Sequence, residues 1–302
     1  MVKLMYYPIL RGKRSEFLAI KELLENTEIS KVVPIIEPVR AGFSELIAAI
    51  KSLNGYDIEP VIIVNPNKGD FNKVHTFIYD DLKAQDTGIK FIPCLDTTDD
   101  NYQIHLDKFD KFSLFTNGIT NEIIDLSHKA FSTFVGSSTS EATLEKMNSV
   151  VLYGDFFQSQ KRNADYPVES YFSDLHTSFQ DKPNTVGFAD YTITGKDFSD
   201  TGGPAVVVTI HASYFKDDTH APMYVRHYLS YDDGEQKNPG DKFKDALEKF
   251  IAEVEEDKLG FEETFAISKF KNLNLIKHFP GLGQVKKLSM MHHIETVNNY
   301  LI

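Results

Sequence analysis

Charged side chains directly follow the first apolar run of the sequence. The stretch "YYPILRGKRSEFLAI" (6–20) passes from apolar residues into the charged segment 11–16. Cations at the end of a buried strand lose hydration, so they need carboxylates or an anionic ligand as partners. We therefore expect Arg11 and Lys13 to bind a small anionic ligand and to face carboxylates across a shared pocket.

Glu37 is the first candidate for acid–base chemistry. In "VVPIIEPVR" (32–40) it follows two isoleucines and precedes a proline. Burial of a carboxyl group raises its pKa toward the range that suits a general acid or base. The alternative is an internal salt bridge from Glu37 to Arg11 or Arg40.

The segment "IIVNPNKGD" (62–70) places Asn65 and Lys68 beside Gly69. Such a turn can hold an anion with its backbone amides, and Lys68 would add a positive charge. The spacing is not that of a P-loop. A simple connection between a strand and a helix is the alternative.

The long connection "GDFFQSQKRNADY" (154–166) gathers Asp155, Arg162 and Asn163. Long loops on a rigid scaffold often carry binding residues, and the planar guanidinium of Arg162 suits a phosphate or carboxylate. We expect Arg162 and Asn163 to bind the ligand. The alternative is a solvated loop held together by its own ion pairs.

A third acidic candidate, Asp190, lies in "VGFADYTI" (186–193) beside Tyr191, which has the opposite orientation on a strand. A buried aspartate needs a partner, and His211 or His227 would supply one and tune an imidazole for proton transfer. We assign Asp190 and His211 as catalytic and Tyr191 as ligand-binding, with a structural Asp–His pair as the alternative. A divalent metal on Asp155, Glu37 and Asp190 is a further alternative, and the sequence leaves any other cofactor open.

Alternating strand and helix patterns must position these residues. In "EFLAIKELLE" (16–25), the apolar side chains fall on one helical face, and the segments 43–53 and 75–85 are similar. Eight apolar runs predict a TIM-like (β/α)8 barrel, with functional residues at the carboxyl ends of the strands. An open doubly wound sheet is the alternative, because "AFSTFVG" (130–136) is a ninth candidate strand. The eight runs are 3–10, 31–39, 60–66, 90–96, 111–119, 149–157, 185–193 and 205–214.

The alternation of strand-like and helix-like patterns ends after residue 214. Segment 223–233 predicts a β-hairpin arm with the preceding strand, 241–257 an amphipathic helix, and 282–302 a last helix after the breaker "PGLG". Within the first part, 167–179 has the pattern of a helix. We divide the chain into a barrel-like domain with its hairpin arm, 1–257, and a helical extension packed on it, 258–302.

Composition limits the classes of function. The formal net charge of −12 argues against non-specific binding of nucleic acid. One cysteine, Cys94, excludes a disulfide framework and favours a reducing, cytoplasmic location. No stretch predicts a signal peptide or a membrane span. The oligomeric state stays open.

Several ordered segments resemble the bacterial and phage beta-protein family. They are "YYPILRGKRSEFLAI", "VVPIIEPVR", "IIVNPNKGD", "GDFFQSQKRNADY", "SYFSDLHTSF", "VGFADYTITG", "GGPAVVVTIHASY" and "VRHYLSYDD". The likeness spans residues 4 to 250. It implies a phage-related or mobile-element setting and carries over no catalytic residues.

Two functions follow as expectations. The first is a barrel enzyme, with a hydrolase or phosphodiesterase-like activity, that acts on a small phosphorylated or nucleotide-like ligand in anti-phage defence or a phage-related role. The second is a non-catalytic component of a two-gene defence or counter-defence system, which binds a protein encoded nearby.

Overall fold

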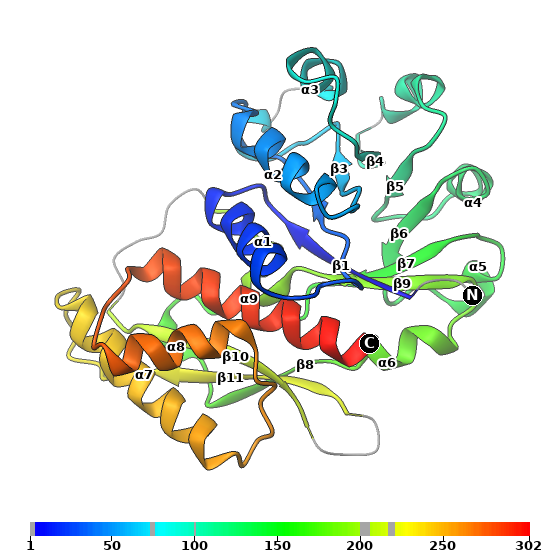
Figure 1. The fold of residues 1–302 in the computed structure, drawn as a ribbon. Helices are drawn as coiled ribbons and strands as arrows, with labels where there is room; N and C mark the ends of the chain where they lie inside the picture. The colour runs from blue at the N-terminus through cyan, green and yellow to red at the C-terminus, as the bar shows by residue number, and fades with distance from the viewer. Residues whose placement is uncertain (1–3, 73–75, 100, 200–205, 217–220) are drawn as a thin grey trace.

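The computed structural model describes residues 4–72, 76–99, 101–199, 206–216 and 221–302. Eight parallel strands close into a barrel, with helices around the outside (Figure 1). This confirms the predicted TIM-like barrel over the open doubly wound sheet. The barrel strands are β1 (Met5–Leu10), β2 (Ile35–Ile36), β3 (Val61–Ile63), β4 (Ile92–Asp96), β5 (Ser113–Phe115), β6 (Ser132–Gly136), β7 (Val150–Gly154) and β9 (Thr185–Asp190).

The barrel closes between its first and last strands. Strand β9 pairs in parallel with β7 and with β1, where Tyr7 lies opposite Ala189. A separate cluster of buried side chains fills the barrel interior, from Tyr7 and Ile9 on β1 to Ala189 on β9. The opposite faces of the strands pack against the outer helices in the larger core.

The prediction of the eighth barrel strand was wrong. Segment 132–136 is the sixth barrel strand, and the run assigned to 205–214 contributes β10 (Thr209–Phe215) to a separate sheet. The error has a physical reason. Strand β6 is short and carries Ser132 and Thr133. In contrast, Val206, Val207 and Val208 form an apolar run directly before β10, whose Ile210, Ala212 and Tyr214 are buried in the larger core.

Helices follow most barrel strands as the periodicity predicts. On the first of them, the apolar face of Phe17, Ile20, Leu23 and Leu24 is buried. The Glu16 carboxylate accepts hydrogen bonds from the backbone N–H groups of Arg11 (2.7 Å) and Lys13 (3.1 Å), which fixes the turn between β1 and this helix. The barrel helices are α1 (Arg14–Asn26), α2 (Ser44–Asn54), α3 (Tyr79–Gln85), α4 (Asn121–Ser127) and α5 (Glu141–Leu144), with 3-10 turns η1 (Gly69–Phe71) and η2 (Tyr102–Lys108).

A three-stranded antiparallel sheet lies beside the barrel, in the order β10, β11, β8. Strand β11 (Met223–Leu229) pairs with β10, which confirms the predicted hairpin. The helix predicted over 167–179 was wrong in its first half, because Glu169–Ser173 forms β8 on β11. Sheet hydrogen bonds pair the backbone of those residues with β11. The short helix η3 (Asn163–Asp165) precedes β8, α6 (Leu175–Ser178) and η4 (Phe179–Asp181) follow it, and η5 (Thr192–Thr194) follows β9.

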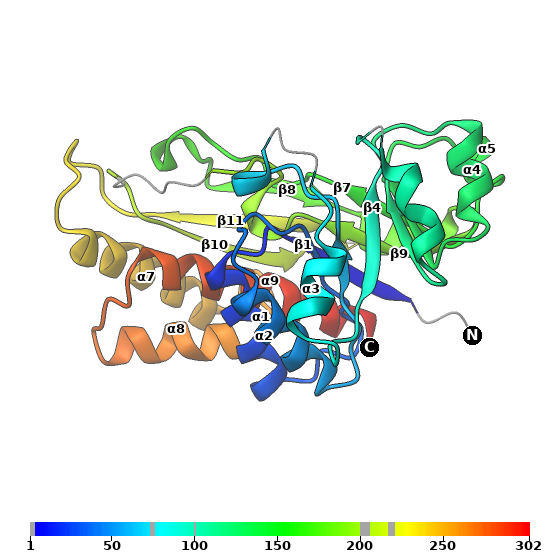
Figure 2. The same ribbon diagram turned by 90° about the horizontal axis from the view of Figure 1, so that it is seen from above.

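Three longer helices lie on one side of this second sheet, where two of them contact its strands and α8 packs on these two (Figure 2). They are α7 (Pro239–Glu256), α8 (Phe265–Leu275) and α9 (Leu282–Leu301). Helix α9 runs between the barrel helix α1 and strand β10, with contacts to both (Figure 1). The division at residue 257 stays a prediction. No helix in the described part of the chain is long and apolar enough to cross a membrane.

Candidate functional site at the carboxyl ends of the strands

Strand alternation builds a polar layer on top of the apolar barrel interior. The interior cluster includes Ile9, Ile35, Ile63 and Cys94, each two positions before a polar residue. Because side chains alternate between faces along a strand, these polar residues continue the inward-facing rows at the carboxyl ends. The layer contains Arg11, Glu37, Asn65 and Asp96, with Tyr153 and Tyr191 from the other side of the barrel.

Glu37 is the centre of this layer. Arg11 Nη1 forms an ion pair with Glu37 Oε2. The Lys68 ammonium lies 2.7 Å from Glu37 Oε1 and 2.9 Å from Oε2. The side chain of Lys68 is 34% exposed, whereas that of Glu37 is 3% exposed. Lys68 therefore connects a buried carboxylate with solvent. The predicted alternative of a salt bridge to Arg11 is present, whereas Arg40 pairs with Asp70.

Arg11 and Lys13 also hold the segment that follows β9. The Arg11 guanidinium donates to the carbonyl oxygen of Lys196 and lies over the Tyr191 ring, 4.7 Å from its centroid. Lys13 Nζ donates to the carbonyl oxygen of Ser199 at 2.7 Å. Burial raises the pKa of Tyr191 to about 12, so its hydroxyl is a neutral hydrogen-bond donor. Arg11 and Tyr191 thus belong to one packed unit at the barrel mouth.

Asp96 is a second carboxyl group in the layer. It is locked to Asn65 by reciprocal hydrogen bonds: Asn65 Nδ2 donates to the Asp96 carbonyl, and Asp96 N–H donates to Asn65 Oδ1, both at 2.8 Å. Burial and the nearby Glu37 raise the pKa of Asp96, while Thr98 hydrogen bonds and Lys68 oppose the shift. Burial therefore favours the protonated form of Asp96, in which this carboxyl group can donate a proton.

Tyr153 closes the other side of the layer. Its ring stacks on Phe115 with centroids 4.5 Å apart, and its hydroxyl lies 3.1 Å from the Thr116 carbonyl oxygen and contacts Asn117 Oδ1. Burial raises the pKa of Tyr153. The sequence places Asp96 among the polar residues that end the predicted strands, but it gave Asp96 no role, and Tyr153 was not selected. Continuing the inward-facing row from Val151 by one position would have found Tyr153.

Gly69 directly follows Lys68 and has a backbone conformation that other residues rarely adopt. Its φ is +60°, and a Cβ at this position would lie 2.1 Å from the Val39 carbonyl oxygen. We expect Gly69→Ala to lower the free energy of unfolding by about 2–4 kcal/mol, the sum of left-handed strain and a backbone clash. Gly234→Ala is the matched control, because Gly234 has φ +72° with no atom within 4 Å of the added Cβ. It should cost only about 1 kcal/mol. Urea unfolding of both variants checks the difference, and equal losses would contradict the close approach to Val39.

Asp190 and His211 do not lie in this layer. Asp190 faces the outer side of β9, where it accepts hydrogen bonds from Tyr6 Oη and Thr192 N, both at 2.8 Å, and lies 3.4 Å from His293 Nε2. His211 lies on β10, with Nδ1 2.8 Å from His227 Nδ1. The predicted Asp190–His211 pair is therefore wrong, because adjacent residues on a strand face opposite sides and Tyr191 takes the inward position.

The long connection after β7 contributes little to the site. Arg162 is exposed and pairs with Asp165, as the alternative interpretation predicted. Asn163 Nδ2 donates to the Val207 carbonyl at 2.8 Å, so it ties two loops together. Asp155 lies at the rim, where burial raises its pKa and Lys196 opposes the shift.

The residues do not fit the alternative of a metal on Asp155, Glu37 and Asp190, because Asp190 faces the other side of its strand. Among the residues that the structure describes, no group of three His, Cys, Asp or Glu side chains has the arrangement of metal ligands.

Comparisons with protein-family models, with curated proteins and with solved structures give no match. The geometry of the polar layer therefore carries the functional argument.

Proposed function

We propose that this protein is a barrel enzyme that hydrolyses a small phosphorylated or nucleotide-like ligand at the carboxyl ends of its strands. The observation that carries the proposal is the partly exposed Lys68 ammonium, 2.7 Å from the buried Glu37 carboxylate and beside Asp96. The polar layer thus combines two cations, Arg11 and Lys68, with the paired carboxylate of Glu37 and with Asp96, whose pKa is raised. The apolar barrel interior lies directly below this layer.

In this proposal, the incoming phosphate competes with Glu37 for Lys68. An anion that draws the ammonium outward leaves Glu37 with Arg11 alone and free to accept a proton from water. That water attacks phosphorus, the phosphorus–oxygen bond of the ester breaks, and Asp96 gives its proton to the leaving oxygen. Arg11 positions Glu37 and is not the principal phosphate ligand, because its guanidinium is already engaged with Glu37 and the Lys196 carbonyl.

The cellular setting is part of the same proposal. The resemblance to the phage-related beta-protein family supports a role in anti-phage defence or in a phage-related process. A reducing, cytoplasmic location fits the lone buried Cys94.

Hydrolysis of a panel of nucleotides and phosphoesters tests the proposal. We expect turnover of at least one phosphoester by the wild-type protein and a loss of about 100-fold or more in Lys68→Met and Asp96→Asn. Arg162→Ala is the matched control, because Arg162 is an exposed cation paired only with Asp165 among the described residues, and its turnover should be unchanged. No turnover across the panel, or full activity in Lys68→Met, would count against a catalytic polar layer.

A non-catalytic interaction protein is the second candidate. The observation that favours it is the exposure of Leu275 (79%) and Ile276 (56%) at the end of α8, within the segment 258–302. Co-expression with the product of a neighbouring gene, followed by size-exclusion chromatography, tests this candidate. A complex should form with the wild-type protein and be lost in Leu275→Asp, with Val168→Asp, directly before β8, as an exposed control.

A further inference from the structure

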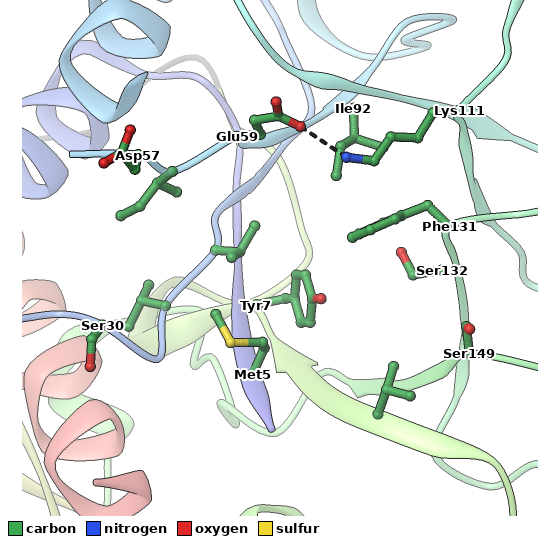
Figure 3. A pocket seen from close by; sticks show the side chains of 14 residues that line it. Met5, Tyr7, Ser30, Asp57, Glu59, Ile92, Lys111, Phe131, Ser132 and Ser149 are labelled. Atoms are coloured by element: carbon green, nitrogen blue, oxygen red, sulfur yellow. Dashed lines mark hydrogen bonds and ion pairs between the residues drawn. The ribbon is translucent and has the colours of Figure 1, made fainter. Parts of the chain in front are cut away.

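A cavity of about 500 Å³ lies at the opposite end of the barrel, where the strands begin (Figure 3). Its walls include Met5 and Tyr7 on β1, Ile92 on β4, Val186 on β9, and Val33 in the segment before β2. This volume is within the range of sites that enclose a small organic molecule. The end of a barrel that carries no chemistry is ordinarily filled by side chains, so an open space of this size needs an explanation.

Tyr7 places a polar group in this cavity. Its ring packs edge-on against Phe134, with centroids 5.3 Å apart, so the two rings separate the cavity from the polar layer above. Tyr7 is only 5% exposed, and its hydroxyl makes no hydrogen bond with the residues that the structure describes. Burial raises its pKa to about 12, so the phenol keeps its proton. The hydroxyl lines the cavity instead of meeting a protein group, so water or a ligand in the cavity supplies its hydrogen-bond acceptor.

A lysine–glutamate ion pair lies at the rim of the cavity. Lys111 Nζ lies 2.9 Å from Glu59 Oε2 and 4.4 Å from the centroid of the Phe131 ring, which is 45% exposed (Figure 3). Asp57 adds a negative charge at the same rim. Among the described lining residues, the lysine is already paired and two carboxylates stand at the rim, so this part of the entrance does not favour an anion.

We propose that this cavity binds an uncharged, largely apolar small molecule with one hydrogen-bond acceptor, which accepts the proton of the Tyr7 hydroxyl. The apolar walls of Met5, Ile92 and Val186 bury the body of the ligand, and Phe131 covers it at the entrance. The site is independent of the proposed hydrolysis, because Tyr7 and Phe134 lie between it and the polar layer.

Two naphthalenes of similar shape, one with an acceptor and one without, test the proposal. The reporter is the ¹³C-methyl resonance of Met5 in the full chain, which contains six methionines, assigned with Met5→Leu. We expect both 2-acetylnaphthalene and 2-isopropylnaphthalene to shift this resonance saturably. The ketone should bind about fivefold more tightly, the factor that one net hydrogen bond contributes. In Tyr7→Phe the two affinities should become equal.

A second test of the proposal fills the cavity with a larger side chain. Val186→Phe should abolish the shift of the Met5 resonance, and Val33→Phe serves if urea unfolding shows that the first variant does not fold. Val168→Phe is the matched control, because Val168 is 62% exposed and lies outside the cavity. No saturable shift in the wild-type protein, a ketone preference that persists in Tyr7→Phe, or unchanged binding in a folded cavity-filling variant would each overturn the proposal.

Discussion

Replacing Arg11 by methionine is expected to lower the free energy of unfolding by about 3–5 kcal/mol. The Arg11 guanidinium and the Glu37 carboxylate are 6% and 3% exposed, so neither is solvated by bulk water. Removing the cation leaves Glu37 with Lys68 alone and leaves the Lys196 carbonyl without its donor. The loss therefore includes the cost of a poorly compensated buried charge, as well as the interaction itself.

A double-mutant cycle separates these two contributions. Arg11→Met combined with Glu37→Met removes both charges and keeps similar volume, so the pair should lose less stability than the two single variants added together, by about 1–3 kcal/mol. Urea unfolding followed by circular dichroism gives all four free energies. Arg162→Met, an exposed arginine paired with Asp165, should change stability by less than about 0.5 kcal/mol. Strict additivity of Arg11 and Glu37 would contradict a coupled pair.

Acidification from pH 6 to pH 5 is expected to lower stability by about 2.7 kcal/mol per pH unit. Burial lowers the pKa values of His176, His227 and His292 to about 4, so the folded protein does not take up protons that the unfolded chain binds below pH 6.5. Glu295 acts in the opposite direction, because burial raises its pKa to about 7 and the folded protein keeps that proton. Among these four groups the net difference is about two protons. His211, whose pKa burial and His227 also lower, adds to the loss, whereas Glu16, Asp96 and Asp155, whose pKa values burial raises, act in the same direction as Glu295.

One histidine provides the control for this pH dependence. His292 Nδ1 lies 2.8 Å from Thr264 Oγ1, and its Nε2 donates to the Ser213 carbonyl at 2.8 Å, so a neutral imidazole fits both contacts. His292→Gln keeps a donor for Ser213 and cannot titrate. Its stability should fall with acid by about 1.4 kcal/mol per pH unit less than that of the wild-type protein. Urea unfolding at pH 7, 6 and 5 checks this, and a flat wild-type profile would contradict neutral buried histidines.

The barrel and half of its polar layer were predictable from the sequence because both depend on local patterns. Apolar runs between amphipathic helices indicate parallel strands, and a polar residue at the end of such a run lies at the carboxyl edge whatever its exact neighbours. That reasoning correctly placed Arg11, Glu37 and Lys68 together. It also left the ion pair with Arg11 open as the alternative role of Glu37.

The rest depended on distant contacts that no local pattern reveals. Strand β10 is as apolar as a barrel strand, because α9 and the outer core cover it, so only its pairing with β11 identifies it as antiparallel. The orientation of Asp190 depends on Tyr6 and on His293, which is more than 100 positions later in the chain. Tyr7 lacks a partner for its hydroxyl among the described residues, and an unfilled space has no signature in a sequence.

The position of α9 has a consequence for how this protein is made on the ribosome. Asn298 hydrogen-bonds with the backbone of Glu28 and Lys31 next to the barrel, while His293 and His292 bond to Ser213 on the second sheet. Until residues 282–301 leave the exit tunnel, both partners present uncovered apolar surface to solvent. Nascent chains of this protein should therefore depend on chaperones until α9 has emerged, and premature stop codons before Leu282 should yield products that proteases remove.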